Sequence, residues 1–211
     1  MKDIVIIGSG AFAREVNWII KRINSVKSEW NIVGFLDDDE SLIGKTIDGV
    51  KVMGNIDFIS QMGNVFTVCA ICNAKIRKEI IVRISQYENV SFATIVDPSA
   101  ICHPTAKIGE GSVLCCNTMV NIETVIGSHV ALVDRCAVGH NSIVGDYSVL
   151  FVGSIIAGNV TVGECCELGM GSNVIQSKTI GDNCIIGACA CVVKDISSDH
   201  TAVGVPAKII K

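Results

Sequence analysis

Every sixth residue from Ile108 onward is aliphatic, over fifteen consecutive positions without an insertion. These positions are Ile108, Leu114, Val120, Ile126, Leu132, Val138, Val144, Leu150, Ile156, Val162, Leu168, Val174, Ile180, Ile186 and Val192. A period of six gives one flat face per repeat, so three repeats make one 18-residue coil of a parallel β-helix. Successive coils stack at the strand spacing of roughly 4.8 Å, so each residue contacts those 18 positions before and after it.

The other positions of the repeat fit a narrow interior. Glycine follows the aliphatic residue in eight of the fifteen repeats, and the position four residues after it is small or β-branched, with Lys178 as the exception. Cys136, Cys166 and Cys184 occupy this small position, where serine or alanine would also fit. We therefore interpret these cysteines as structural.

The chain up to about residue 95 has a different pattern, in which short apolar runs alternate with amphipathic segments. This alternation is typical of βαβ units on a parallel sheet. We expect strands over residues 4–7, 31–36, 65–69 and 90–95, and helices over residues 11–24, 55–62 and 74–87. The sequence thus predicts a Rossmann-like α/β domain over residues 1–95 and an all-β parallel β-helix over residues 96–211.

The amino-acid composition and net charge exclude several classes of binding partner. Hydrophobic residues make up 49% of the 211 residues and charged residues 18%, which excludes intrinsic disorder. The net charge of −4 gives no basic footprint for nucleic acid or for an anionic membrane, so we expect small-molecule partners. The first residues have no long apolar segment typical of a signal peptide, so we expect a cytoplasmic protein.

Eleven cysteines without an export signal favour reduced thiols over a disulfide framework. Cys69 and Cys72 have the spacing of half a zinc site, but no second pair with this spacing completes it. They follow a predicted strand, so we interpret them as buried structural residues.

Seven segments along the whole chain resemble the bacterial family of sialic-acid and sugar acyltransferases. They span residues 6–11, 34–38, 76–78, 139–140, 143–147, 157–160 and 203–208. Members of this family N-acetylate a UDP-4-amino-sugar in bacillosamine synthesis or acetylate related sugars. The resemblance implies a left-handed β-helix, a homotrimer with active sites between neighbouring β-helices, and acetyl-CoA bound along the helix wall.

His140 matches the catalytic histidine of that family. An imidazole titrates near neutral pH and is suited to accept the proton that an amine or hydroxyl loses while it attacks a thioester. A zinc site like that of γ-type carbonic anhydrases is the metal alternative, but the spacings between His103, His129, His140 and His200 do not bring them to one site. We expect no metal.

The stacking rule places Gly158 one coil after His140. Lacking a Cβ, Gly158 leaves its backbone N–H free to stabilise an oxyanion, although a glycine that only turns the corner is the alternative. The resemblance implies contacts to CoA at Val149, Met170 and Ala188, largely through the backbone. The family has a histidine in place of Val149, so one polar contact to CoA is missing here.

Lys194 and Lys208 are available for the phosphates of CoA. Exposed lysines on a protein surface are, however, often only solvated. These two residues are therefore weaker candidates for the cofactor than the three positions given by the resemblance.

The turn Gly8-Ser9-Gly10-Ala11 follows a predicted strand and precedes a predicted helix, where N–H groups and the helix dipole favour a phosphate. An NAD enzyme would need a longer sheet and a second half-site. In the family this turn holds the nucleotide sugar. The candidate substrate-binding residues are Gly10, Ala11, Phe12, Asp37, Asp38 and Asn73.

Two departures from the family pattern surround His140. Asn141 stands where the family has Glu or Asp, and Val133 stands where it has Asn. A carboxylate beside a histidine fixes its tautomer and stabilises the imidazolium. Glu123 lies 18 residues before Asn141, so the stacking rule predicts that Glu123, directly or through Asn141, supplies this carboxylate. Asp134 is the weaker candidate, and a solvated Glu123 is the alternative.

The sequence favours an acetyl-CoA-dependent N-acetyltransferase that acts on a nucleotide-linked amino sugar for surface glycan synthesis. Its candidate catalytic set is His140, Asn141, Glu123 and Gly158. An O-acetyltransferase acting on sialic acid or a similar sugar would use the same residues. A non-catalytic nucleotide-sugar-binding protein is the hypothesis from a different class.

Overall fold

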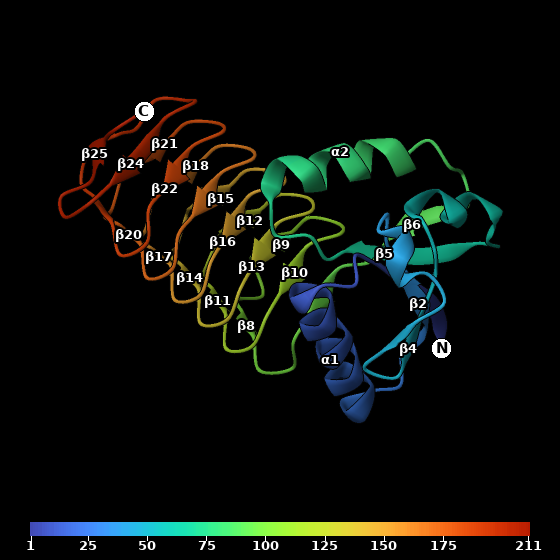
Figure 1. The fold of residues 1–211 in the computed structure, drawn as a ribbon. Coiled ribbons are helices and arrows are strands. Elements are labelled where there is room, and N and C mark those ends of the chain that lie inside the picture. Colours follow the sequence, from blue (N-terminus) through green and yellow to red (C-terminus); the bar gives the residue numbers. More distant parts are fainter.

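The computed structural model describes residues 1–211, with an α/β domain at one end of a three-sided prism of short strands (Figure 1). The domain is a six-stranded sheet of order β3-β4-β2-β1-β5-β6. Its elements are β1 (Lys2–Ile7), α1 (Ala11–Val26), β2 (Trp30–Leu36), β3 (Thr46–Ile47), β4 (Val50–Gly54), β5 (Val65–Cys69), α2 (Ala74–Ile84) and β6 (Val90–Phe92), with 3-10 helices at Glu40–Leu42 and Ile56–Gln61.

The central strand β1 is buried on both faces. Ile4 and Ile6 belong to the core under α1, whereas Val5 and Ile7 belong to the core under α2. Because successive side chains of a strand point to opposite faces, this run of four aliphatic residues packs helices on both sides of the sheet. The expected α/β domain is therefore confirmed.

Three details of this domain differ from expectation. The expected helix over residues 55–62 is a 3-10 helix, Ile56–Gln61. The expected strand over residues 90–95 is divided, because β6 pairs within the α/β sheet while β7 (Ile95–Val96) pairs with the β-helix. The β3–β4 hairpin was not expected, although Asp48 and Gly49 at its turn both have positive φ.

The rest of the chain winds into a left-handed parallel β-helix with three sheets. Its strands are β7 (Ile95–Val96), β8 (Ile101–Cys102), β9 (Lys107–Ile108), β10 (Val113–Leu114), β11 (Met119–Val120), β12 (Val125–Ile126), β13 (Ala131–Leu132), β14 (Ala137–Val138), β15 (Ile143–Val144), β16 (Val149–Leu150), β17 (Ile155–Ile156), β18 (Thr161–Val162), β19 (Glu167–Leu168), β20 (Asn173–Val174), β21 (Thr179–Ile180), β22 (Ile185–Ile186), β23 (Cys191–Val192), β24 (Thr201–Val203) and β25 (Lys208–Ile209).

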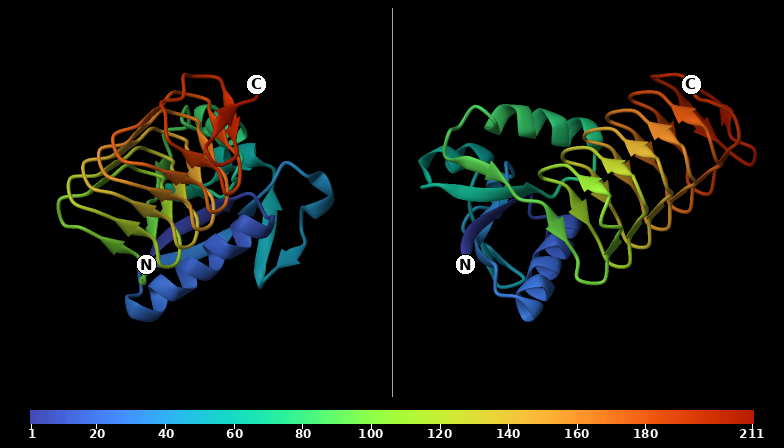
Figure 2. Two further views of the ribbon diagram at one scale, coloured as in Figure 1. Left: turned by 90° about the vertical axis from the view of Figure 1, so that its left-hand side faces the viewer. Right: turned by 180° about the vertical axis from the view of Figure 1, so that it is seen from behind.

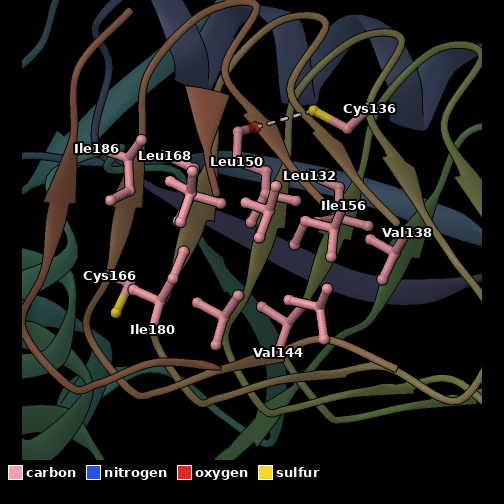
Figure 3. Close-up of a cluster of buried hydrophobic side chains, with 14 of the residues drawn as sticks. Leu132, Cys136, Val138, Val144, Leu150, Ile156, Cys166, Leu168, Ile180 and Ile186 are labelled. Carbon is pink, nitrogen blue, oxygen red and sulfur yellow. Dashed lines mark hydrogen bonds between the residues drawn. The ribbon is translucent and has the colours of Figure 1, made fainter. Parts of the chain in front are cut away.

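The 18-residue coil is confirmed by strand pairing, since Val125 pairs with Ile143 and Ile143 with Thr161. Fourteen of the fifteen predicted aliphatic residues belong to one buried cluster, and Ile108 packs against it. Figure 3 shows some of these side chains, among them Leu132, Leu150 and Leu168, in rows that run along the prism. A residue's inward or outward direction therefore follows from its place in the hexapeptide.

Small polar residues four positions after the aliphatic residue form hydrogen bonds between successive coils. The Ser142 hydroxyl donates to the carbonyl of Ala157 and accepts from the N–H of Val160, each at 3.0 Å. The Cys136 thiol donates to the carbonyl of Leu150 at 3.2 Å (Figure 3). Cysteine thus substitutes for serine in these ladders, and the structural interpretation of Cys136 is confirmed.

Each of the three corners of the prism carries a column of residues 18 positions apart. We name them the histidine corner (Ile122, His140, Gly158, Gln176, Lys194), the methionine corner (Asp134, Val152, Met170, Ala188) and the helix corner (Ser128, Asp146, Glu164, Asp182). At most corners the next residue has positive φ, as do Glu123 at 53° and Asn141 at 55°.

The α/β domain is joined to the first coils of the prism (Figure 2). Arg22 of α1 pairs with the buried Asp97 at 2.7 Å. Burial raises the pKa of Asp97, but hydrogen bonds from Arg22 and Ser99 outweigh this effect and lower the pKa to about 2. Neither helix of the domain has the length and apolarity that a membrane crossing requires.

Candidate active site

His140 lies at the histidine corner directly after β14, with an exposed side chain. Gly139 precedes it, and a Cβ there would collide with the backbone of Ala157 and Gly158. The absence of a side chain at Gly139 therefore lets the turn pack on the next coil. A Cβ at Gly158 would in turn collide with Nε2 and Cε1 of His140. The imidazole thus lies directly over Gly158, as the stacking rule predicts.

A hydrogen-bonded chain runs from His140 to a carboxylate. Nδ1 of His140 is 2.9 Å from Oδ1 of Asn141, and Nδ2 of Asn141 donates to Oε2 of Glu123 at 2.8 Å. Because an amide oxygen only accepts, Nδ1 carries the proton and Nε2 presents a lone pair. The predicted contact between Glu123 and Asn141 is present. Asp134 is outside this chain, since its carboxylate accepts from the N–H of Cys116 at the methionine corner.

The backbone N–H of Gly158 donates to no acceptor within the protein. It belongs to the residue against which the imidazole packs. An available base nitrogen and an available N–H donor therefore lie side by side at the histidine corner. Acyl transfer requires a group that accepts a proton and a hydrogen-bond donor that stabilises the oxyanion, and this pair can supply both.

The three positions expected to contact CoA do not share one surface. Met170, 58% exposed, and Ala188 lie one coil apart at the methionine corner. Val149 is 0% exposed and packs with Phe12 of α1, and its N–H donates to the carbonyl of Cys166. Its side chain is therefore covered by the protein's own α/β domain, and it offers CoA no contact surface in the protomer.

Lys194 and Lys208 lie together at the C-terminal end of the prism. They line a cavity of about 310 Å³ with neighbouring residues of the last coil and the terminal hairpin. Lys194 belongs to the histidine corner, three coils from His140. Two ammonium groups are thus available at the C-terminal end of the prism, three coils beyond the candidate base.

The N-terminus of α1 is open to an anion. Its N-cap, Gly10, has no side chain to satisfy the first N–H groups, and the first helical bond is donated by Arg14 to Gly10. These free N–H groups and the helix dipole favour a phosphate near Gly10, Ala11 and Phe12. The preceding turn is fixed by Asp37, which accepts from the N–H of Ser9 at 2.8 Å and from its hydroxyl at 2.6 Å.

The remaining two candidate substrate residues are engaged within the protein. Asp38 pairs with Arg83 at 2.8 Å and accepts from the N–H of Ile56. Asn73 caps α2 by accepting from the N–H of Ile76, and Glu167 accepts from the N–H of Ala74. The N-terminus of α2 is therefore already occupied, whereas that of α1 is free.

The other histidines are far from a common centre. His129 is 4% exposed, stacks on Tyr147 and meets Phe92 edge to face, and burial and the charge of Arg77 lower its pKa to about 4. His103 bonds locally to Thr105, and His200 to the turn at Ser197. No group of three or more His, Cys, Asp or Glu side chains is arranged to hold a metal ion.

Sequence reasoning left Arg77 without a role, although its segment was one of those that resemble the family. Its side chain is buried between the α/β domain and the helix corner. An arginine in an amphipathic helix is usually solvated, and no local signal distinguishes a buried one. The burial depends on how two domains pack.

Comparison with known proteins shows what the chain is similar to. Residues 3–84 match the family model described as the PglD N-terminal domain. Over 120 residues the chain is 29% identical to UDP-N-acetylbacillosamine N-acetyltransferase of Bacillus subtilis (strain 168), an alignment that covers 54% of this chain and 51% of that protein. The chain therefore aligns with about half the length of this curated relative.

Two solved structures match over almost the whole chain. One is a histidine-to-asparagine variant of perosamine N-acetyltransferase from Caulobacter crescentus in complex with CoA and GDP-perosamine. Its sequence is 27% identical, its TM-score is 0.90, and the match covers 100% of this chain and 98% of that chain. The other is the acetyltransferase domain of PglB from Neisseria gonorrhoeae FA1090 with acetyl coenzyme A, with 25% identity, a TM-score of 0.91 and coverage of 99% for both chains. Over its whole length the chain is thus similar to sugar acetyltransferases built from hexapeptide repeats.

Proposed function

We propose that the protein transfers the acetyl group of acetyl-CoA to the amino group of a nucleotide-linked amino sugar, as a step in building surface glycans. The observation that carries the proposal is the position of His140, whose Nδ1 is bonded to Asn141 and whose Nε2 lies beside the free N–H of Gly158. Full-length similarity to structures holding CoA with GDP-perosamine, or acetyl-CoA alone, supports it. The open N-terminus of α1 supports a diphosphate-bearing acceptor.

The site supplies each step of the transfer. The sugar amine attacks the thioester carbonyl, and Nε2 of His140 accepts the proton that the nitrogen loses. The N–H of Gly158 stabilises the oxyanion of the tetrahedral intermediate. When the intermediate collapses, the carbon–sulfur bond breaks and the imidazolium returns the proton to the leaving thiolate. The products are the N-acetylated sugar and CoA.

A homotrimer would bring the two halves of the site together. In one protomer His140 is at the histidine corner, while Met170 and Ala188 are at the methionine corner. Apolar side chains flank His140 on the neighbouring sheets and are exposed in the protomer; they are Met119, Ile122, Val125, Ile143 and Ile155. Packing this surface against a second β-helix would bury them and set Met170 and Ala188 of the neighbour beside His140.

The test of the proposed activity is incubation with acetyl-CoA and a panel of UDP-, GDP- and dTDP-linked 4-amino sugars, followed by measurement of free thiol. We expect thiol release with at least one amino sugar and mass spectrometric detection of its N-acetyl product. Release with sialic acid but with none of the amines would replace the proposal with O-acetylation. No release with either class would indicate a binding protein.

Asp37→Ala is expected to raise the KM for the sugar nucleotide about tenfold. The change removes two hydrogen bonds to Ser9, each contributing about 1 kcal/mol, and frees the turn that presents the α1 N-terminus. The KM for acetyl-CoA is expected to stay unchanged, because Asp37 lies only in the α/β domain. Steady-state kinetics with each substrate varied in turn measures both constants. Equal increases in the two would refute this division of roles.

Glu123→Gln is expected to lower kcat about tenfold, because a neutral amide replaces the charged acceptor of a hydrogen bond. Without the carboxylate, Asn141 is held less firmly beside Nδ1 of His140, so the imidazole is less well oriented for proton transfer. Adding Asn141→Asp places a carboxylate directly beside Nδ1 of His140 and is expected to restore the rate. The measurement is kcat across the pH range.

Glu110→Gln is the matched control, since this exposed glutamate lies at a different corner and its side chain has no partner. It should leave the pH–rate profile unchanged. Full activity of Glu123→Gln at every pH would show that the chain of hydrogen bonds does not position His140.

A further inference from the structure

Arg77 is 2% exposed and uses all five of its N–H donors on backbone carbonyls. These carbonyls belong to Ile71, Cys72, His129, Tyr147 and Ser148. The first two lie in the loop between β5 and α2, and the other three lie beside the helix corner of the β-helix. One guanidinium therefore joins two segments of different domains, and no carboxylate bonds to it.

Most of these five carbonyls have Arg77 as their only hydrogen-bond donor. Those of Ile71, Cys72, His129 and Tyr147 accept no other hydrogen bond from the protein, whereas that of Ser148 also accepts from the N–H of Ala131. A buried carbonyl without a donor is costly, so loss of the guanidinium would favour separation of the loop from the corner. Lysine has only three donors on a point-like head and would satisfy part of the set.

The loop held by Arg77 lies against the candidate phosphate turn. A Cβ at Gly8 would lie 2.8 Å from the Cδ1 atom of Ile71 and 3.3 Å from the carbonyl of Ala70, so the two segments are in close contact. Gly8 leads into Ser9 and Gly10, whose position determines where the α1 N-terminus points. A packed path thus runs from the β-helix through Arg77 and Ile71 to the turn expected to bind the diphosphate.

Two further contacts attach the same turn of α2 to the β-helix. Glu167 accepts from the N–H of Ala74 at 3.1 Å, and Lys78 pairs with Glu164 at 2.9 Å. The Lys78 pair is solvent-exposed and contributes little by itself. The buried contacts of Arg77 are therefore the principal polar link at this side of the junction.

We propose that Arg77 is a positioning residue of the acceptor site, which fixes the 71–73 loop and the phosphate turn relative to the β-helix. This inference rests on the proposed function, because the site it positions is that of the nucleotide sugar. Arg77→Met is expected to raise the KM for the sugar nucleotide more than tenfold, and Arg77→Lys to raise it less. The KM for acetyl-CoA is expected to change by less than twofold in both.

Ile84→Val is the matched control for loss of stability. Ile84 is buried on the same helix, belongs to the core under α2 and makes no hydrogen bond to the β-helix, and this substitution typically costs about 1 kcal/mol. We expect its sugar-nucleotide KM to equal that of the unmodified protein. A general loss of domain stability would raise the KM in this control as well, and that result would overturn the assignment to Arg77.

The cysteines of the junction give a readout that does not depend on catalysis. Cys72 is half-buried beside Arg77, and Cys165 is buried beside α2, lining a cavity of about 330 Å³ with Lys75 and Lys78. Iodoacetamide labelling followed by peptide mass spectrometry is expected to increase at both thiols in Arg77→Met, relative to the exposed Cys189. Ile84→Val is expected to leave this ratio unchanged.

The two readouts separate the possible failures. Unchanged labelling in both Arg77 variants would overturn the proposal whatever the kinetics, and so would increased labelling with an unchanged sugar-nucleotide KM. If the unmodified protein acetylates no amino sugar, the proposed function fails, whereas labelling still tests whether Arg77 fixes the junction. If Arg77→Met does not fold, Arg77→Lys provides both measurements.

Discussion

Replacing His140 with alanine is expected to lower the rate of acetyl transfer by about 10²–10⁴-fold, the usual contribution of a general base. The thermal unfolding midpoint is expected to stay the same, because the side chain is exposed and its hydrogen bond is made to the equally exposed Asn141. Thiol release and a thermal melt on the same preparation measure the two quantities. The substitution therefore separates chemistry from folding.

His103→Ala provides the control for this variant, since His103 is also exposed on the β-helix and bonds only to Thr105. It should retain the full rate. A near-normal rate in His140→Ala would assign the proton transfer to another group or to solvent and would remove the central step of the proposed mechanism.

Gly158→Ala is expected to lower kcat by about 10²-fold, the effect of misplacing a catalytic group by about 1 Å. The added Cβ would occupy the space of the His140 ring, so the imidazole must rotate away from the thioester. Stability is expected to change little, because the displaced atoms are the end of an exposed side chain. Steady-state kinetics and a thermal melt test both statements.

A double-mutant cycle identifies how Gly158 acts. In the His140→Ala background the ring is absent, so Gly158→Ala is expected to cost little more. Gly63→Ala is the control, since a Cβ at Gly63 meets no atom within 4 Å. An undiminished 10²-fold loss in the double variant would show that the alanine disturbs the backbone N–H rather than the ring.

The repeat explains why so much of the site was predictable. In a β-helix, neighbours in space are a fixed 18 residues apart, so the sequence alone placed Gly158 under His140 and Glu123 beside Asn141. Such contacts are normally hidden in a sequence because they depend on tertiary structure. Here the period of 18 residues allows these contacts to be found by counting along the sequence.

Where the period stops, prediction from the sequence also stopped. The burial of Val149 under Phe12 follows from how the α/β domain docks, and the hexapeptide pattern contains no information about that face. The β3–β4 hairpin did have a signal, since Asp48-Gly49 is a common hairpin turn. The strand expected over residues 90–95 was one apolar run in sequence that serves two sheets.

The unbroken hexapeptide frame restricts how the length of this β-helix can change. A deletion of six residues would rotate every later side chain to the next face, and only a change of 18 residues would keep the columns aligned. His140 and Lys194 are three coils apart, about 14 Å at roughly 4.8 Å per coil. The distance between His140 and Lys194 can therefore lengthen or shorten only by whole coils, in steps of roughly 4.8 Å.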